Sequence, residues 1–324
     1  MLRVRNLDKV YKVGTFGTDS LHAVRDVSFD VSAGEVVSLI GESGSGKSTI
    51  GKLVLRLIDT TEGTIEFDGT DISHLGKREL REYYRTTQGV FQDPFSSYNP
   101  IFKIDRAFDT VRRTYFRAMK NDEWDKKVRE AVRTVSLEPD SVLGKYPHQL
   151  SGGQLQRLLI ARALLLDIKL LVADEIISML DASTRIDVLN LLGELREQGL
   201  GILFVTHDLS LGNYVSDKVV ILYKGRIVES GKTEKVFGNP LHPYTRNLLA
   251  SVPQLDRKWA EVEAEEALRA ESLRGRCLYH EHPEVLETDT GLMEVDNAHL
   301  VGCFAMGAED PCPVKEASEV PTMK

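Results

Sequence analysis

The sequence predicts an α/β fold built around a parallel sheet, and two observations support this. Apolar runs of strand length, at residues 35–40, 169–173 and 201–206, alternate with stretches whose apolar residues recur at helical spacing. A glycine-rich segment, residues 41–48, lies directly between the first of these strands and a helix. Strands that alternate with helices pair in parallel through right-handed crossovers, so we expect one parallel sheet with helices packed against it.

The other elements follow from the same periodicities. Residues 2–4 and 27–31 alternate apolar and polar side chains, as half-buried strands do. Helical spacing predicts helices from Ser48 onward, over residues 124–137, and between the two later strands, where residues 188, 191, 192 and 195 share one side. A hairpin after Asp217 is predicted to turn at Lys224-Gly225, and an acidic helix is predicted near residues 259–273.

Length and charge limit the organisation of the chain and its function. It has 324 residues, with 41 Lys and Arg against 49 Asp and Glu, and a net charge of −8. At about 100–200 residues per domain this length suggests two folding units. The acidic balance argues against binding nucleic acid through a broad basic surface. Because proline, histidine and acidic residues increase from about residue 233, we expect a first domain of residues 1–235 and an extension of residues 236–324.

Neither a targeting signal nor a membrane span is predicted. The first residues carry charges where a signal peptide has an apolar run, and no stretch of about 18 uninterrupted apolar residues occurs. All three cysteines, Cys277, Cys303 and Cys312, lie in the last fifty residues. This cysteine usage is typical of a reducing compartment rather than of a disulfide-stabilised secreted domain.

Residues 41–48, GESGSGKS, match the pattern G-x-x-x-x-G-K-[ST] of a phosphate-binding loop. The glycines let backbone N–H groups turn toward phosphate oxygens at the positive end of the following helix. Lys47 is long enough to reach the terminal phosphates, and the Ser48 hydroxyl can bind Mg²⁺. The position between a predicted strand and a predicted helix distinguishes this motif from an ordinary glycine-rich turn.

A second candidate site lies at the end of the strand at residues 169–173. Asp174 and Glu175 follow this strand, at the edge of the sheet where open α/β folds bind ligands. Asp174 would hold magnesium, directly or through water, and Glu175 would orient and deprotonate the attacking water. An apolar strand that ends in Asp-Glu is weak evidence alone, but in a chain with a phosphate loop it indicates phosphoryl transfer.

Residues 150–154, LSGGQ, indicate a further anion site. Ser151, Gly152 and Gly153 offer a hydroxyl and N–H groups at the start of a predicted helix. One nucleotide does not require two separate phosphate cradles in one chain. The simplest interpretation is that this segment closes over the nucleotide of a partner subunit.

Together these motifs resemble those of the ATP-binding subunits of ABC transporters, and the resemblance covers nearly the whole chain. It implies a P-loop NTPase fold with a RecA-like core, an antiparallel β subdomain, a helical subdomain at about residues 93–165, and a small C-terminal extension. It also implies an ATPase that uses ATP and Mg²⁺, with the nucleotide bound between the phosphate loop of one subunit and the LSGGQ segment of another.

The resemblance assigns further individual residues. Gln92, in VFQDPFSSYNP, is similar to the glutamine that senses magnesium and the membrane partner. Asp181 resembles the D-loop aspartate, and His207, in VTHD, resembles the histidine that contacts the γ-phosphate; a buried core histidine is the alternative for His207. Tyr11 resembles the aromatic residue that stacks on adenine, a role that the nearby Phe16 could also serve.

The implied site residues fall into three groups. The catalytic residues are Glu175, His207, Lys47 and Gln92, and the magnesium ligands are Ser48, Gln92 and Asp174. The ATP contacts are Tyr11, Gly41, Ser43, Gly44, Ser45, Gly46, Lys47, Ser48, Thr49, Ser151, Gly152, Gly153, Gln154 and Asp181.

Two positions depart from the family pattern. Ile176 stands where the family usually has proline after the catalytic glutamate, which predicts a less rigid loop. Leu155 stands where Arg or Lys is common, which would remove a charge near the nucleotide. Glu175 itself is present, so the prediction of hydrolysis is unaffected.

Residues 239–253, NPLHPYTRNLLASVP, resemble the segment that follows the nucleotide domain in the oligopeptide/dipeptide importer branch. Members of this branch carry peptides, nickel or short oligosaccharides, and residues 142–154 with SMLDASTR are closer to the sugar members. The resemblance implies a peripheral ATPase at the cytoplasmic face of a prokaryotic cell membrane. Its partners would be a second, related ATPase subunit in a heterodimer, two transmembrane permeases and, indirectly, an extracytoplasmic solute-binding protein, with no nucleic acid.

The cysteines bear on a possible metal centre, because peptide-branch members often end in four cysteines that hold a [4Fe–4S] cluster. Cys277 matches the first of these positions and Cys303 the last, whereas the two middle positions are not cysteine and Cys312 is additional. Three thiolates with the nearby His282 could bind a cluster or zinc, but the incomplete pattern favours no metal.

Two alternative functions are open on this evidence. A soluble ABC-type ATPase that acts on nucleic acid or ribosomes usually fuses two cassettes or carries a basic or coiled-coil insertion, and neither is visible in this sequence. An exporter ATPase is disfavoured by residues 239–253. The prediction is therefore ATP-driven import of oligopeptides, dipeptides or short oligosaccharides.

Overall fold

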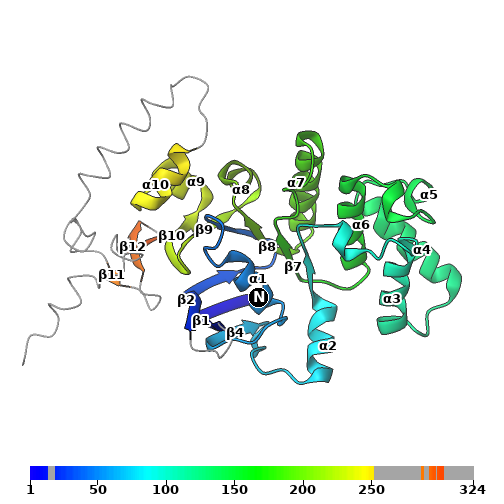
Figure 1. The fold of residues 1–324 in the computed structure, drawn as a ribbon, viewed down its shortest axis with the longest axis horizontal. Coiled ribbons are helices and arrows are strands. Elements are labelled where there is room, and N and C mark those ends of the chain that lie inside the picture. Colours follow the sequence, from blue (N-terminus) through cyan, green and yellow to red (C-terminus); the bar gives the residue numbers. More distant parts are fainter. Residues whose placement is uncertain (14–18, 252–285, 288–291, 297, 303–324) are drawn as a thin grey trace, which may run out of the picture. The chain divides into compact units, whose positions relative to one another are not determined.

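The computed structural model describes residues 1–13, 19–251, 286–287, 292–296 and 298–302, which Figure 1 shows coloured along the sequence. The chain divides into two compact units. The first unit contains residues 1–31, 36–74 and those from 205 onward, and the second contains residues 32–35 and 75–204.

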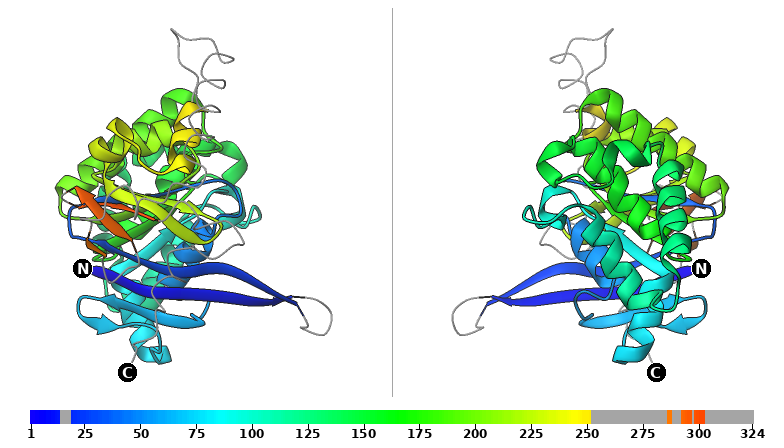
Figure 2. Two further views of the ribbon diagram at one scale, coloured as in Figure 1. Left: turned by 90° about the vertical axis from the view of Figure 1, so that its left-hand side faces the viewer. Right: turned by 90° about the vertical axis from the view of Figure 1, so that its right-hand side faces the viewer.

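An antiparallel sheet opens the first unit. It contains β1 (Leu2–Val13), β2 (Asp19–Val31), β4 (Glu62–Phe67) and β5 (Thr70–Asp71), in the order β2-β1-β4-β5. Figure 2 shows β1 and β2 running side by side as a long pair. Val4 lies opposite both Phe29 and Ile65, and the three side chains are buried. The predicted alternation is therefore confirmed, and its apolar side forms part of the core.

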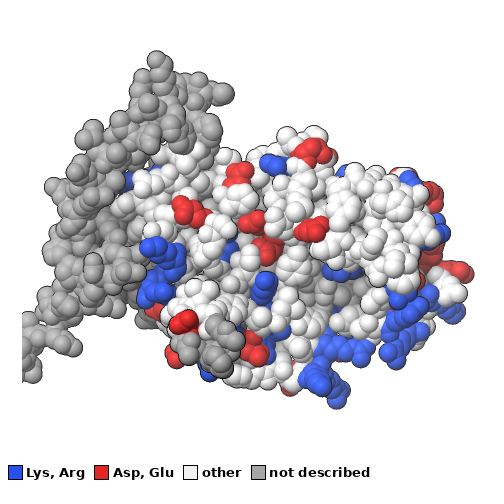
Figure 3. Space-filling model, in the orientation of Figure 1, with Lys and Arg blue, Asp and Glu red and all other residues white. Residues whose placement is uncertain are grey.

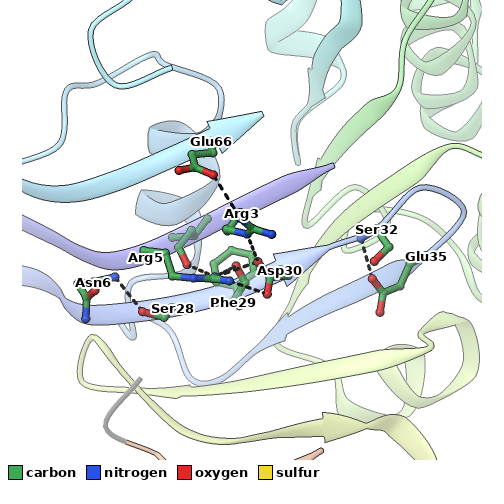
Figure 4. A network of polar contacts seen from close by, with 10 residues as sticks. Arg3, Arg5, Asn6, Ser28, Phe29, Asp30, Ser32, Glu35 and Glu66 are labelled. Atoms are coloured by element: carbon green, nitrogen blue, oxygen red, sulfur yellow. Dashed lines mark hydrogen bonds and ion pairs between the residues drawn. The ribbon is translucent and has the colours of Figure 1, made fainter. Parts of the chain in front are cut away.

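Ion pairs cross the polar side of this sheet (Figure 4). The Arg5 guanidinium lies 2.9 Å from one carboxylate oxygen of Asp30 and donates to the other at 3.0 Å. Arg3 lies 3.8 Å from Asp30 and 3.6 Å from Glu66, so it joins β2 to β4. Because these side chains are largely exposed, each pair contributes at most about 1 kcal/mol and mainly supports the strand register.

A second group of strands in the first unit leads into the phosphate loop. β3 (Val36–Ile40) pairs in parallel with β9 (Lys218–Tyr223), and β9 pairs antiparallel with β10 (Arg226–Lys232). The predicted hairpin turn is confirmed, since Lys224 and Gly225 have φ values of 46° and 83°, as a type I′ turn requires. β10 then pairs with β13 (His299–Val301), followed by β12 (Met293–Asp296) and β11 (Leu286–Glu287).

Among its described residues, the first unit has four helices. They are α1 (Lys47–Val54), α8 (Leu209–Val215), α9 (Thr233–Gly238) and α10 (Pro243–Ala250). Ile40, Leu209, Val219, Ile221, Val228 and Val236 form a buried cluster against which Tyr244 and Leu248 of α10 pack. The expected end of the first domain at residue 235 falls inside α9.

The second unit combines parallel strands with six α-helices and two 3-10 helices. β6 (Thr87–Val90) pairs in parallel with β7 (Leu170–Asp174). β8 (Gly201–Thr206), of which residues 201–204 belong to this unit, lies beside β7. The α-helices are α2 (Lys77–Thr86), α3 (Asp105–Tyr115), α4 (Asn121–Thr134), α5 (Pro139–Val142), α6 (Gly152–Leu164) and α7 (Ala182–Glu197). The 3-10 helices are η1 (Phe95–Ser97) and η2 (Pro147–Gln149).

One helix prediction differs from the structure in its range. The helix predicted over residues 124–137 is α4, which begins at Asn121 and ends at Thr134. It ends early because Ser136 adopts a left-handed φ of 56°, which a right-handed helix does not allow. The acidic helix predicted near residues 259–273 lies outside the described residues.

Positive charge is concentrated in one part of the second unit despite the net charge of −8. Figure 3 shows Lys and Arg side chains gathered where α2 and α3 lie in Figure 1. Lys77, Arg78 and Arg81 of α2 and Arg106 and Arg113 of α3 are exposed. This surface is therefore basic although the chain as a whole is acidic.

In the part of the chain that the structure describes, every helix is too short or too polar to cross a membrane.

Candidate nucleotide site

The phosphate loop, residues 41–46, connects β3 to α1 in the order that the sequence predicts. Gly44 and Gly46 have φ values of 83° and 103°, which favour glycine. A Cβ atom on Gly46 would lie 2.6 Å from the Ala23 carbonyl oxygen, and one on Gly41 would lie 2.2 Å from that of Leu222. Close packing therefore requires glycine at both ends of the loop, and at Gly46 the backbone conformation requires it as well.

The Lys47 ammonium lies against this loop. Its Nζ donates to the carbonyl oxygens of Gly41 and Glu42, both at 2.7 Å, and lies 3.4 Å from the Ser45 hydroxyl. Only 4% of Lys47 is exposed. A buried ammonium beside the N–H groups of a helix start creates positive potential in a small volume, which suits an anion such as a terminal phosphate.

The rest of the loop differs in exposure. Ser45 is buried, Ser48 and Thr49 at the start of α1 are half-buried, and Ser43 and Gly44 are exposed. The loop is also tied to neighbouring segments. The Gly225 N–H donates to the Ser45 carbonyl at 3.1 Å, and the Glu42 N–H donates to the Tyr244 hydroxyl at 3.1 Å.

Tyr244 is a contact of the loop that sequence reasoning missed. The sequence of residues 239–253 indicates a transporter branch but no contact with the phosphate loop. The two hydrogen-bonded residues are 202 positions apart, so no local spacing connects them. The available signal was an aromatic hydroxyl immediately after His-Pro, at the start of a helix.

His207 and Tyr11 also belong to the first unit. His207 is exposed directly after β8, and Asp208 caps α8 by accepting from the N–H groups of Ser210 and Leu211 at 2.9 and 3.2 Å. A Cβ on Gly212 of α8 would lie 2.6 Å from the Ile40 side chain, so α8 packs closely on the strand that enters the phosphate loop. Tyr11 is half-buried on β1, and Phe16 lies outside the described residues.

The Asp-Glu pair lies in the second unit. Asp174 ends β7 and is 8% exposed, and Glu175 follows it. Glu175 has a φ of 50°, a left-handed conformation that is uncommon for residues other than glycine and concentrates at functional sites. Its carbonyl oxygen accepts from the Ser178 N–H at 3.1 Å and from the Ser178 hydroxyl at 2.9 Å. Ile176, in place of the usual proline, is 1% exposed and belongs to the core.

The LSGGQ segment forms the start of α6. The Ser151 hydroxyl accepts from the Gln154 N–H at 3.2 Å, and the Gln154 side chain accepts from the Ser151 N–H at 3.0 Å, which is a capping box. Leu155 is fully buried. Its side chain is part of the buried core. That this leucine removes a charge near the nucleotide stays a prediction.

Gly153 packs against α7, and this contact leads to a prediction. A Cβ on Gly153 would lie 2.3 Å from the Thr184 methyl carbon. Gly153→Ala is therefore expected to lower the free energy of unfolding by about 1–3 kcal/mol, as overpacking does, measured by denaturant unfolding. Thr184→Ser removes that methyl and keeps the hydroxyl bonded to Asp181, so it should restore most of the loss.

Gly193→Ala is the matched control for this prediction, because a Cβ on Gly193 of α7 meets no atom within 4 Å. It should be neutral or stabilising by up to about 1 kcal/mol. An equal loss in Gly153→Ala with and without Thr184→Ser would contradict the packing explanation.

Asp181 and Gln92 complete the second unit's candidate residues. Asp181 caps α7: its carboxylate accepts from the Ser183 hydroxyl at 2.7 Å and from the Thr184 N–H and hydroxyl at 3.0 and 2.8 Å. These hydrogen bonds, that from Ser183 first, lower the pKa of Asp181, so the carboxylate stays charged. Gln92 is exposed, two residues after β6.

The candidate residues thus divide between the two units. The phosphate loop, Tyr11 and His207 lie in the first, and Gln92, LSGGQ, Asp174, Glu175 and Asp181 lie in the second. Cys277, Cys303 and Cys312 lie outside the described residues. Among the residues that are described, no group of three or more His, Cys, Asp or Glu could hold a metal ion.

A phosphate loop between strand and helix, an Asp-Glu pair after a parallel strand, and LSGGQ at a helix start define an ATP-binding cassette ATPase. The ABC transporter family matches residues 24–178, and the oligopeptide/dipeptide transporter C-terminal region matches residues 228–282. The chain belongs to the ABC transporter family, as an ATP-binding protein that carries this C-terminal region. ATP hydrolysis is its activity.

Curated relatives are similar over most of their length. A putative peptide import ATP-binding protein of Brucella ovis is 44% identical over 257 residues, which cover 79% of this chain and 80% of the relative. The dipeptide transport ATP-binding protein DppF of Lactococcus lactis subsp. cremoris and the oligopeptide transport ATP-binding protein OppF of Streptococcus mutans are each 41% identical. Each match covers 79% of this chain and 82% of the relative.

Solved structures confirm the predicted fold class. A dimeric ATP-binding cassette in a post-hydrolysis state, bound to ADP and phosphate, is similar with a TM-score of 0.65 and 30% identity. The match covers 72% of this chain and 99% of that one. The protein cbiO1 of Clostridium perfringens, part of the ABC transporter complex cbiONQ, has a TM-score of 0.64 and 27% identity, over 74% of this chain and 90% of that one.

Proposed function

We propose that this chain is the ATP-hydrolysing subunit that powers import of oligopeptides or dipeptides through a membrane ABC transporter. The observation that carries the proposal is the match of residues 228–282 to the oligopeptide/dipeptide transporter C-terminal region. The names of the relatives support peptides as cargo rather than oligosaccharides. They give no support to an exporter or to an ATPase acting on nucleic acid or ribosomes.

The phosphate loop supplies positive charge to the proposed ATP site. We assign Lys47 to the terminal phosphates, because its buried ammonium already lies within the loop that would surround them. Gly41, Ser43, Gly44, Ser45, Gly46, Ser48 and Thr49 would contact the phosphates mainly through backbone N–H groups. We assign Tyr11 to the adenine ring, which an aromatic side chain can stack on.

The reaction itself is assigned to carboxylate and imidazole groups. Glu175 would accept a proton from the attacking water, and His207 would donate to the γ-phosphate. Ser48, Gln92 and Asp174 offer hydroxyl, amide and carboxylate oxygens, which are the ligands that Mg²⁺ prefers. When bound, Mg²⁺ neutralises charge on the phosphates.

A second subunit would complete the site. Ser151, Gly152, Gly153 and Gln154 at the start of α6 are proposed to contact the nucleotide held by a related ATPase subunit, with Asp181 beside them. We propose a heterodimer beneath two permeases at the cytoplasmic face of the membrane, supplied by an extracytoplasmic solute-binding protein. We also propose that the chain consists of a cassette of residues 1–235 and an extension of residues 236–324. The separate match of residues 228–282 supports a role of its own for the extension.

Reconstitution tests this function. The chain, its partner ATPase and the two permeases are placed in vesicles, with the solute-binding protein and labelled peptides outside. We expect ATP enclosed in the vesicles to drive peptide uptake, and peptide-loaded binding protein to raise the rate of hydrolysis. Uptake of a β-glucoside or of nickel in place of peptides would contradict the proposed cargo while leaving the ATPase assignment in place.

The cysteines at 277, 303 and 312 are proposed to hold no [4Fe–4S] cluster, because two of the four family positions are not cysteine. Iron and sulfide analysis of the anaerobically purified full chain tests this. Four iron atoms and four sulfides for each chain would overturn the proposal.

A further inference from the structure

We propose that Tyr244 is a positioning residue of the phosphate loop, through which the residues that follow β10 set the affinity for ATP. The inference rests on the assignment of residues 41–48 to the ATP phosphates. It concerns a side chain outside that loop, in the short helix α10.

The first step is the contact itself. The Glu42 N–H donates to the Tyr244 hydroxyl at 3.1 Å, and the Glu42 carbonyl accepts from Lys47 Nζ at 2.7 Å and from the Ser45 N–H at 3.2 Å. Glu42 is therefore held from outside the loop by Tyr244 and from inside by the lysine assigned to the phosphates. The loop contains three glycines, so it loses much conformational entropy when it becomes ordered. A contact that orders it before ATP arrives lowers the entropy cost of binding.

The second step is that the Tyr244 side chain is itself fixed in place. Its ring centroid lies 4.3 Å from that of Tyr223, at the end of β9, with the ring planes tilted by 41°. The Tyr244 N–H donates to His242 Nδ1 at 3.1 Å, and Pro243 occupies the first turn of α10. Burial raises the pKa of Tyr244 to about 12, so the hydroxyl stays neutral and brings no negative charge toward a phosphate site.

The third step connects this tyrosine to the C-terminal strands. Glu229 of β10 is fully buried, and its carboxylate accepts from the N–H groups of Leu241 at 2.8 Å and His242 at 3.0 Å. His299 Nε2 of β13 lies 2.7 Å from the same carboxylate. A buried carboxylate is stable only when it is fully hydrogen-bonded, so Glu229 holds β13 and the residues before α10 in one arrangement. Contacts within the first unit thus run from β13 through Glu229, His242 and Tyr244 to Glu42.

Tyr244→Phe tests the proposal because it keeps the ring and its packing and removes only the hydroxyl. The KM for ATP of the full chain in its transporter is expected to rise about three- to tenfold, the effect of losing one hydrogen bond, while kcat stays within about twofold. A purely structural role would instead lower the amount of active protein, and therefore the apparent kcat, without changing KM. Tyr223→Phe is the matched control, since it removes a hydroxyl from the ring that packs on Tyr244, and it should leave KM unchanged.

Amide hydrogen exchange gives a second readout that does not depend on activity. In the wild-type chain the Glu42 amide is expected to exchange slowly although the residue is exposed, and in Tyr244→Phe it should exchange faster. Unchanged KM together with unchanged exchange at Glu42 would overturn the proposal. If instead Lys47→Ala left ATP affinity intact, the phosphate-loop assignment would fail, and this outcome is distinguishable from failure of the Tyr244 contact.

Discussion

Glu175→Gln is expected to lower kcat for ATP hydrolysis by about 100- to 10,000-fold, the range that general acid–base catalysis contributes, while ATP affinity changes little. The carboxylate and the carboxamide have nearly the same shape, so the half-buried position after β7 should be kept, including the bonds from Ser178 to the Glu175 carbonyl. Only the ability to accept a proton from water is lost. Steady-state hydrolysis and binding of a fluorescent ATP analogue to the full chain separate the two effects.

Glu194→Gln is the control for this result, because Glu194 is an exposed residue of α7 and undergoes the same chemical change. Its kcat should equal that of the wild type. Hydrolysis at the wild-type rate in Glu175→Gln would show that another group is the base. A large loss of ATP affinity in that variant would show that Glu175 acts in binding instead.

Lys47→Ala is expected to weaken ATP binding and to lower kcat/KM by at least about 100- to 1000-fold, the effect of removing one group that stabilises developing charge. The ammonium is buried within the phosphate loop and is bonded to the Gly41 and Glu42 carbonyl oxygens, so the substitution removes both a positive charge and a support of the loop. Equilibrium binding of a fluorescent ATP analogue and the rate of phosphate release measure the two losses.

Lys52→Ala provides the comparison for Lys47→Ala, since Lys52 is an exposed lysine on the same helix α1. It should keep wild-type binding and turnover. Thermal unfolding of both variants shows whether the loop substitution has affected the fold. A folded Lys47→Ala protein with wild-type affinity for ATP would contradict the assignment of residues 41–48 as the phosphate site.

Much of the fold could be predicted because it is encoded by local patterns. β8 has the predicted bounds, and β3, β7 and the hairpin turn at Lys224-Gly225 lie within one or two residues of their predictions. Each is a contiguous apolar run or a turn whose residue types suit positive φ. α9, α10 and β13 were not predicted, because they are short and acquire stability by packing against or pairing with β10 rather than from their own periodicity.

The candidate site shows the same division, residue by residue. The phosphate loop, the Asp-Glu pair and LSGGQ were recognised because each places its functional groups within a few consecutive residues. The same motifs do not predict the left-handed backbone of Glu175 or the buried position of Leu155. Both depend on how the chain around them is packed.

The sequence by itself determined the α/β class, the family and the short motifs, because hydrogen bonds in turns, caps and helix starts join residues that are close along the chain. Only the tertiary structure decided that Tyr244 contacts Glu42, that Thr184 leaves no room for a side chain at Gly153, and that Glu229 holds His299. The residues in these contacts lie far apart in the sequence, from 31 positions for Gly153 and Thr184 (184 − 153) to 202 positions for Glu42 and Tyr244. Such contacts depend on the path of the whole chain, which leaves no periodic signal in the sequence.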